Sequence, residues 1–103
     1  MPAALLSRDE VIARIRKHAD AIRAEGATAL YLFGSAARDD MKVASDIDVF
    51  VECDPNRAVS LLHIIGIKHI IEDNVGRRVD ITTKESLHPL LRDRILNEAI
   101  RVL

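Results

Sequence analysis

The chain has 103 residues, enough for one domain and too few for two. With 49% hydrophobic and 30% charged residues it is neither disordered nor fibrous, and no apolar run approaches the roughly 18 residues that cross a bilayer. Fifteen basic and 16 acidic residues give a formal net charge of -1, which excludes a general electrostatic attraction for nucleic acid.

The first half of the chain predicts a helix, a strand, a short helix and a second strand. Ser7 is placed to cap a helix whose apolar residues recur at helical spacing until Gly26 ends it. Residues 28–33, TALYLF, are apolar and rich in strand formers. Residues 35–38 fit one or two helical turns, and after a polar loop we expect a strand over residues 46–52.

The second half predicts helix, strand and helix. Residues 57–74 have a helical pattern with apolar positions on more than one stripe, so this helix is either wrapped by the fold or covered in part by another chain. Residues 78–83 predict a third strand, and a final helix is expected from about His88, with Val102 on its apolar face. The predicted fold class is α/β or α+β, with helices packed on a small mixed β-sheet in a single domain over residues 1–103.

Three aspartates interrupt the apolar pattern of the second and third strands. Residues two apart in a strand share a face, so Asp46 and Asp48 project together, about 7 Å apart along the backbone. Asp80 lies between apolar residues of the third strand, and all three carboxylates converge if the two strands are neighbours. Carboxylates this close raise one another's pKa unless a cation compensates, and hard oxygen ligands suit Mg²⁺. Two Mg²⁺ ions in such a site would support an in-line phosphoryl or nucleotidyl displacement.

A Gly-Ser pair stands between the first strand and the short helix. Gly34 lets the backbone approach a ligand, and the freed N–H groups with the Ser35 hydroxyl can hold phosphate oxygens. Arg38, one turn further, can add a cation to a triphosphate. An isolated Asp-x-Asp is more often solvated charge, and an isolated Gly-Ser is only a turn. Packing alone does not explain why both motifs occur together with an aspartate in the third strand. The combination therefore favours a metal- and phosphate-binding site.

This arrangement resembles the signature of the nucleotidyltransferase superfamily that includes DNA polymerase beta. The signature is Gly-Ser, ten residues, Asp-x-Asp and an Asp in a later strand, carried here by Gly34, Ser35, Asp46, Asp48 and Asp80. The short length and the stretches SDIDVFVE, RRVDITTKESL and LRDRILNEAIRVL look more narrowly like the minimal nucleotidyltransferase (MNT) antitoxins. These are paired with HEPN-domain ribonuclease toxins. The resemblance covers nearly the whole chain and implies the palm-like fold of that superfamily.

The resemblance also implies an activity: an enzyme that uses Mg²⁺ to transfer AMP from ATP to a tyrosine of a HEPN toxin, which silences the toxin's ribonuclease site. Asp46 and Asp48 would bind both Mg²⁺ ions. Asp80 would bind the metal beside the attacking hydroxyl and help to deprotonate it. The triphosphate of ATP would be held by Gly34, Ser35 and Arg38.

Two positions depart from many members of this family: Ala36 stands where they have an arginine, and Asp39 where they have a glycine. These departures leave open a binding-only antitoxin that occludes its toxin and keeps the acidic cluster as a vestige. A third alternative is nucleotidyl transfer to a small molecule or an RNA end. The absence of an acceptor domain and the near-neutral charge count against that alternative.

The expected partners are a HEPN toxin, in a hetero-oligomer, and ATP, with no direct contact to nucleic acid and no membrane association; a homodimer is also compatible with the sequence. The apolar excess of residues 58–71 is a candidate docking surface, although packing within the domain accounts for the larger share. The start, MPAALLSRDE, has no basic region and too short an apolar stretch for a signal peptide. Cys53 is the single cysteine of the sequence and can form no internal disulfide, which fits a reducing compartment. We therefore expect a cytoplasmic protein.

Overall fold

Four strands form one mixed sheet in the computed structural model, which describes residues 6–103. Their spatial order is β3-β2-β1-β4; β1 is antiparallel to both β2 and β4, whereas β2 and β3 run parallel. The strands are β1 (Ala27–Phe33), β2 (Ile47–Cys53), β3 (Val79–Thr83) and β4 (Ile100–Arg101). The prediction of an α/β protein with a small mixed sheet is confirmed.

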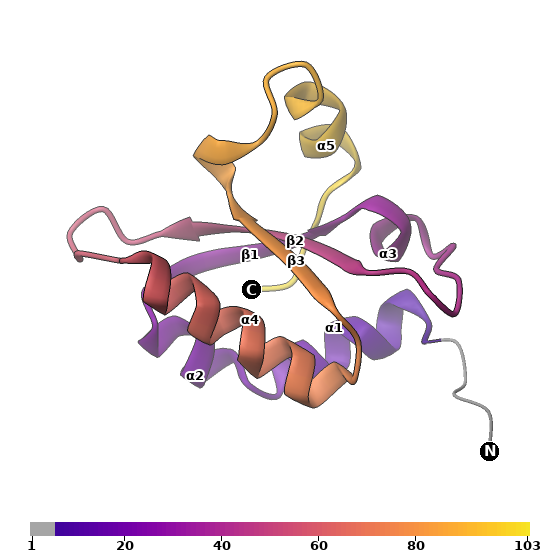
Figure 1. The fold of residues 1–103 in the computed structure, drawn as a ribbon, viewed down its shortest axis with the longest axis horizontal. Coiled ribbons are helices and arrows are strands. Elements are labelled where there is room, and N and C mark those ends of the chain that lie inside the picture. Colours follow the sequence, from indigo (N-terminus) through magenta and orange to yellow (C-terminus); the bar gives the residue numbers. More distant parts are fainter. Residues whose placement is uncertain (1–5) are drawn as a thin grey trace.

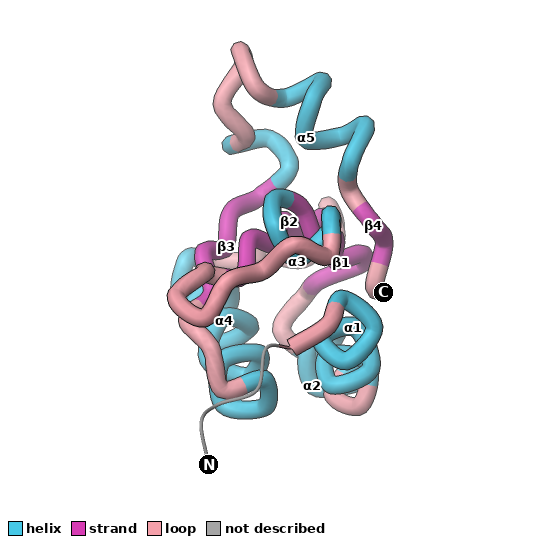
Figure 2. The backbone as a smooth tube through the Cα atoms, turned by 90° about the vertical axis from the view of Figure 1, so that its right-hand side faces the viewer, coloured by secondary structure: helices cyan, strands magenta, loops and turns pink. Residues whose placement is uncertain are grey.

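The helices lie on both sides of this sheet. Figure 1 shows α1 (Arg8–Arg16), α2 (Ala19–Ala24) and α4 (Leu61–Val75) beneath one face. The short helix α3 (Gly34–Arg38) follows β1, and α5 (Arg92–Glu98), which comes after a 3-10 turn (Lys84–Ser86), stands above the opposite face in Figure 2. None of the helices between residues 6 and 103 is both long and apolar enough to cross a membrane.

The core lies between the sheet and the three helices beneath it. Alternation along β2 turns Ile47, Val49 and Val51 toward these helices, and all three are fully buried. Asp48 therefore points to the face under α5. That face also carries an aromatic stack in which the Tyr31 and Phe50 rings lie 4.7 Å apart. Tyr31 is half-buried in this stack.

The first predicted helix is two helices. Ser7 caps α1 as expected, because its hydroxyl accepts a hydrogen bond from the Glu10 backbone N–H at 3.2 Å. The helix ends at Arg16, and α2 begins at Ala19 after a short turn. This turn redirects the chain so that Ile22 of α2 is buried in the same core as the apolar face of α1.

The long helix α4 begins at Leu61, later than the predicted start at residue 57. The Ser60 backbone N–H donates to Nδ1 of His63 at 3.0 Å, and this cap starts the helix. Arg57 is used elsewhere, since its guanidinium donates to the Arg23 and Ala24 carbonyls at the end of α2. The apolar excess divides into a buried stripe and an exposed group: Leu61, Leu62 and Ile65 are exposed.

The prediction of one helix from about His88 through Val102 is wrong at both ends. The chain turns at His88–Leu91, α5 covers Arg92–Glu98, and β4 then pairs with β1. The Val102 N–H donates to the Leu30 carbonyl at 2.8 Å, and the Val102 side chain is buried. An edge strand left unpaired exposes backbone donors and acceptors, so pairing the C-terminal segment with β1 overrides its helical pattern.

Candidate active site

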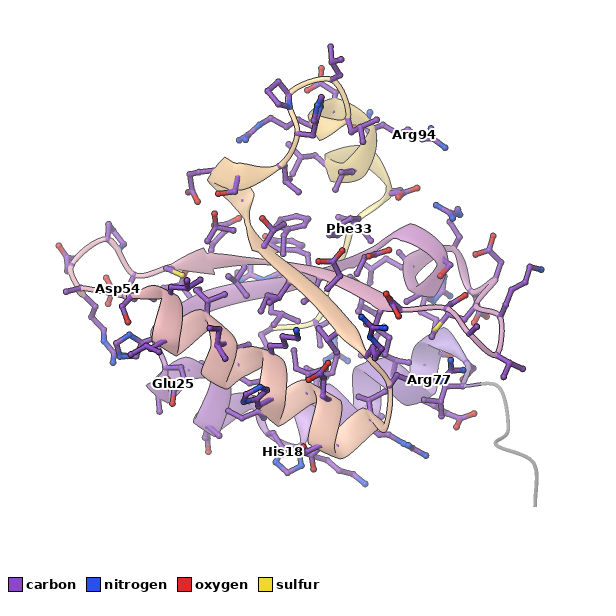
Figure 3. The ribbon with its side chains drawn as sticks, in the orientation of Figure 1. His18, Glu25, Phe33, Asp54, Arg77 and Arg94 are labelled. Atoms are coloured by element: carbon purple, nitrogen blue, oxygen red, sulfur yellow. The ribbon has the colours of Figure 1, made fainter. Side chains whose placement is uncertain are left out.

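The turn after β1 lies directly beside Asp48. Phe33, the last residue of β1, is paired with Asp48 of β2. Gly34 has φ +67°, a conformation that favours glycine, and a Cβ built at this position would collide with Oδ2 of Asp48. Gly34 is thus required both by the backbone of the turn and by the position of the Asp48 carboxylate. Figure 3 labels Phe33 on the side of the sheet that faces α5.

The structure brings the carboxylates of Asp46 and Asp80 near that of Asp48. In the parallel pairing of β2 with β3, Asp48 stands opposite Asp80. Asp46 precedes β2, and the ladder continues there because the Ile47 N–H donates to the Arg78 carbonyl at 2.9 Å. Burial raises the pKa of Asp48, and the nearby Asp80 and Asp46 carboxylates raise it further. The like charges are therefore close enough to repel one another.

The donor chemistry of this cluster fits Mg²⁺. Carboxylate oxygens are the ligands this ion prefers, and a cation would relieve the repulsion that raises the pKa of Asp48. Within residues 6–103, however, no group of three or more His, Cys, Asp or Glu side chains is arranged so that it could hold a metal ion. The assignment of Asp46, Asp48 and Asp80 as metal ligands stays a prediction.

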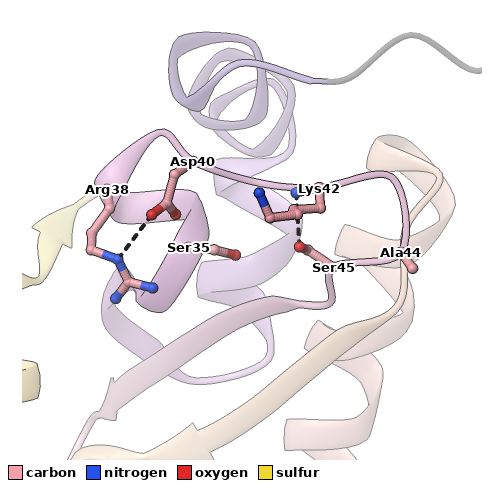
Figure 4. A pocket seen from close by; sticks show the side chains of 6 residues that line it. All are labelled: Ser35, Arg38, Asp40, Lys42, Ala44 and Ser45. Carbon is pink, nitrogen blue, oxygen red and sulfur yellow. Dashed lines mark hydrogen bonds and ion pairs between the residues drawn. The ribbon is translucent and has the colours of Figure 1, made fainter.

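A pocket of about 450 Å³ lies between α3 and the loop that leads to β2. Figure 4 shows its side chains, which include the hydroxyl of Ser35 and the cations of Arg38 and Lys42. The Lys42 backbone N–H donates to the Ser45 hydroxyl at 2.9 Å, which shapes the loop. The predicted phosphate-binding residues Ser35 and Arg38 thus line one pocket, together with Asp40, Ala44 and Ser45, whereas Gly34 and Asp48 line a separate pocket that also contains Arg38.

Arg38 is already paired with two carboxylates. Its guanidinium lies 3.4 Å from Asp40 and 3.2 Å from Glu98, and both partners raise the pKa of Arg38. The Gly34 backbone N–H donates to Oε1 of the same Glu98 at 3.0 Å. Sequence reasoning missed Glu98, which lies 60 residues from Arg38 along the chain on an ordinary amphipathic segment.

Arg77 organises the loop that leads into β2. Its Nη1 donates to the backbone carbonyls of Lys42, Val43 and Ser45. These are the residues immediately before Asp46, so Arg77 holds the segment that places this carboxylate. The sequence carries no pattern that links Arg77 to a loop more than 30 residues earlier, because the contact depends on the pairing of β3 with β2.

The two departures from the family pattern have structural roles away from the pocket. Asp39 has φ +59° and ends α3 in the left-handed conformation, where a glycine is the usual residue. Its Oδ1 accepts a hydrogen bond from the Arg8 backbone N–H at 2.7 Å, so the carboxylate is engaged with the start of α1. Ala36 is fully buried in the core.

Comparison with known proteins identifies related chains. A family model described as nucleotidyltransferase domain matches residues 15–102. A relative from Methanocaldococcus jannaschii, provisionally named a protein adenylyltransferase, is 49% identical over 72 residues, which cover 70% of this chain and 75% of the relative. The protein adenylyltransferase MntA of Thermococcus cleftensis is 30% identical over 100 residues, which cover 96% of this chain and 99% of MntA.

Solved structures share the fold. One that is provisionally described as a minimal nucleotidyltransferase has a TM-score of 0.79 and 32% identity, with 95% of this chain and 98% of that chain covered. The complex of a tri-AMPylated Shewanella oneidensis HEPN toxin with an MNT antitoxin contains a chain with a TM-score of 0.63 and 16% identity, with 90% of this chain and 71% of that chain covered. The predicted nucleotidyltransferase fold is confirmed.

Proposed function

This chain belongs to the nucleotidyltransferase domain family, among its minimal members, and is an enzyme of that class; on this premise we propose that it is an antitoxin that adenylylates a HEPN toxin. The proposed reaction transfers AMP from ATP to a tyrosine of a cognate HEPN ribonuclease. A protein adenylyltransferase that aligns over nearly the whole chain supports it, and so does a fold shared with the antitoxin of a tri-AMPylated HEPN toxin complex. The observation that carries it is the pairing of Asp48 with Asp80 beside the Gly34 turn.

In the proposed mechanism the tyrosine oxygen attacks the α-phosphorus of ATP. A bond forms between this oxygen and the phosphorus, the bond to the bridging oxygen of pyrophosphate breaks, and pyrophosphate leaves. Asp80 accepts the phenolic proton. Mg²⁺, held by Asp46, Asp48 and Asp80, would supply positive charge to the attacking and leaving oxygens.

The proposal puts the triphosphate next to these carboxylates. In the proposal, the Gly34 N–H and the Ser35 hydroxyl donate to phosphate oxygens, and Arg38 supplies a cation. The pocket of about 450 Å³ that Ser35 and Arg38 line lies between α3 and the loop before β2. Gly34 is in contact with Asp48, so a phosphate at the turn would be adjacent to the aspartate that faces Asp80.

The test uses this chain, Mg-ATP and a candidate HEPN toxin. Intact-mass analysis should show adenylyl mass on the wild-type toxin and none on a toxin whose candidate tyrosine is replaced by phenylalanine. Asp48→Asn and Asp80→Asn should abolish the modification while the circular dichroism spectrum is retained. Asp73→Asn, an exposed position on α4, is the control and should keep full activity. Unchanged modification by Asp48→Asn would contradict the proposal.

A second candidate function is binding-only neutralisation, in which the antitoxin occludes its toxin. One observation favours it: the Gly34 N–H and Arg38 are both engaged by Glu98, and Arg38 also pairs with Asp40. A triple variant with alanine at positions 46, 48 and 80 separates the two functions. Neutralisation of the toxin by this variant, without ATP, would support occlusion, whereas loss of neutralisation with retained complex formation would support adenylylation.

A further inference from the structure

Glu98 occupies the groups that the proposed function assigns to the triphosphate. This residue is the last of α5 and is half-buried. Its Oε1 accepts from the Gly34 backbone N–H at 3.0 Å, and its Oε2 lies 3.2 Å from Nη1 of Arg38. A carboxylate and a phosphate are both anions that accept hydrogen bonds from backbone N–H and guanidinium groups. The two anions therefore compete for the same donors.

We propose that Glu98 is a competitor for the triphosphate: it holds Gly34 and Arg38 in the nucleotide-free chain, must withdraw when ATP binds, and so sets the affinity for nucleotide. The inference rests on the proposed function, because it takes Gly34 and Arg38 as the phosphate donors. It adds a residue that neither the signature motif nor the spacing of the motif includes.

The position of Glu98 allows this withdrawal. Within Arg92–Glu98 no side chain is fully buried, so α5 contributes nothing to the core beneath the sheet. The segment stands above the sheet as an arch, which Figure 1 shows. A pocket of about 180 Å³ lies under it, between Phe33 and Gly34 on one side and Leu91 and Ile95 on the other. Glu98 and α5 can therefore shift without opening the core.

The energy of the contact also allows displacement. The Arg38 side chain is 46% exposed and the Glu98 side chain 23% exposed, and partly exposed ion pairs contribute little to the free energy of folding. Glu98 also adds negative charge near Asp48, since both side chains line the pocket under α5. Its withdrawal would lower the repulsion against an incoming anionic nucleotide as well as free the donors.

The test measures equilibrium binding of α,β-methylene ATP, an analogue that cannot transfer AMP, to the full chain in the presence of Mg²⁺. Glu98→Ala should bind about tenfold more tightly than the wild type, because the binding-competent state no longer has to displace the carboxylate. Glu98→Gln should gain less, since its amide oxygen still accepts from the Gly34 N–H. Asp93→Asn is the matched control: it removes an exposed acid from α5 and leaves Glu98 on Gly34 and Arg38, so the affinity for the analogue should change less than twofold.

Adenosine, which has no phosphates, is the second probe. The affinity for adenosine should be the same in the wild type and in Glu98→Ala, and an equal gain for adenosine would overturn the inference, because Glu98 would then only obstruct the pocket. If the wild type binds the ATP analogue and Glu98→Ala, shown by thermal melting to be folded, binds it no more tightly, the inference is overturned and the proposed function is not. Failure of both the wild type and Glu98→Ala to bind the analogue would overturn the proposed function, and the inference with it.

Discussion

The carboxylate of Asp48 lies where a side chain on Gly34 would otherwise stand. The antiparallel pairing of β1 with β2 brings the two residues together, because Phe33 is opposite Asp48 and Gly34 follows at once. The Gly-Ser turn and the Asp-x-Asp strand are thus parts of one site rather than two separate motifs. Substitution of Gly34 should therefore affect the carboxylate directly.

Gly34→Ala should abolish adenylyl transfer and destabilise the fold. Its left-handed backbone, φ +67°, costs about 1 kcal/mol or more with an alanine, and the new Cβ would also push the Asp48 carboxylate away. Gly76→Ala separates these causes, since Gly76 has φ +74° and no atom within 4 Å of a built Cβ. Urea unfolding should show a smaller loss of the free energy of unfolding for Gly76→Ala than for Gly34→Ala, and the transfer activity of Gly76→Ala should be unchanged. Equal effects of the two substitutions would contradict the role of contact with Asp48.

Asp48→Asn should stabilise the metal-free protein at neutral pH. Burial and the Asp80 and Asp46 carboxylates raise the pKa of Asp48 above its ordinary value of 3.8, so the folded state binds this proton more tightly than the unfolded state. Ionised Asp48 therefore destabilises the fold above its raised pKa, and the penalty fades as the pH falls from that pKa toward 3.8.

Urea unfolding with a chelator, at neutral pH and near the ordinary pKa, checks this pH dependence. The advantage of Asp48→Asn over the wild type should shrink as the pH is lowered. Mg²⁺ should reverse the order at neutral pH, because an ion bound only by the folded wild type stabilises it. An advantage that is independent of pH would rule out the ionisation of Asp48 as its source.

A series at Asp39 should change stability without changing nucleotide transfer. Asp39→Ala loses the hydrogen bond from the Arg8 backbone N–H and must keep φ near +59°, so we expect its free energy of unfolding to fall by about 1–2 kcal/mol. Asp39→Gly loses the same bond but tolerates the left-handed backbone, and should lose less. Asp39→Asn can keep both features and should resemble the wild type. Thermal unfolding gives the order, and a fall in transfer rate for Asp39→Asn would show that this carboxylate acts in the site.

Arg77→Ala should lower the rate of adenylyl transfer about tenfold or more and raise the Mg²⁺ concentration needed for half-maximal rate. The expected cause is looser placement of Asp46, because Arg77 donates to three carbonyls of the loop before it. Arg78→Ala is the matched control, since the Arg78 backbone carbonyl that pairs with Ile47 is kept. Arg77→Lys should restore part of the rate. A shift in Mg²⁺ dependence of the same size in Arg78→Ala would indicate a general charge effect.

Sequence patterns were sufficient for the parts of the site that depend on local periodicity. Alternation in residues 46–52 predicted that Asp46 and Asp48 project from one face of a strand, and the strand, turn and short helix around Gly34 were expected nearly as found. The largest boundary error belongs to a segment whose ends are decided by a distant partner. This is the C-terminal segment, where Val102 pairs with Leu30 and gives up its helical pattern.

Local sequence patterns were enough to predict that the acidic residues share a face of their strand and that a glycine turn precedes them, because these properties follow from the two-residue repeat of a strand and the conformational freedom of glycine. The folded chain was needed to show that Asp48 stands opposite Asp80, that Arg77 holds the loop before Asp46, and that Glu98 reaches Gly34 and Arg38. Strand register and contacts between distant segments depend on backbone pairing and packing across the whole chain, and no local pattern encodes them.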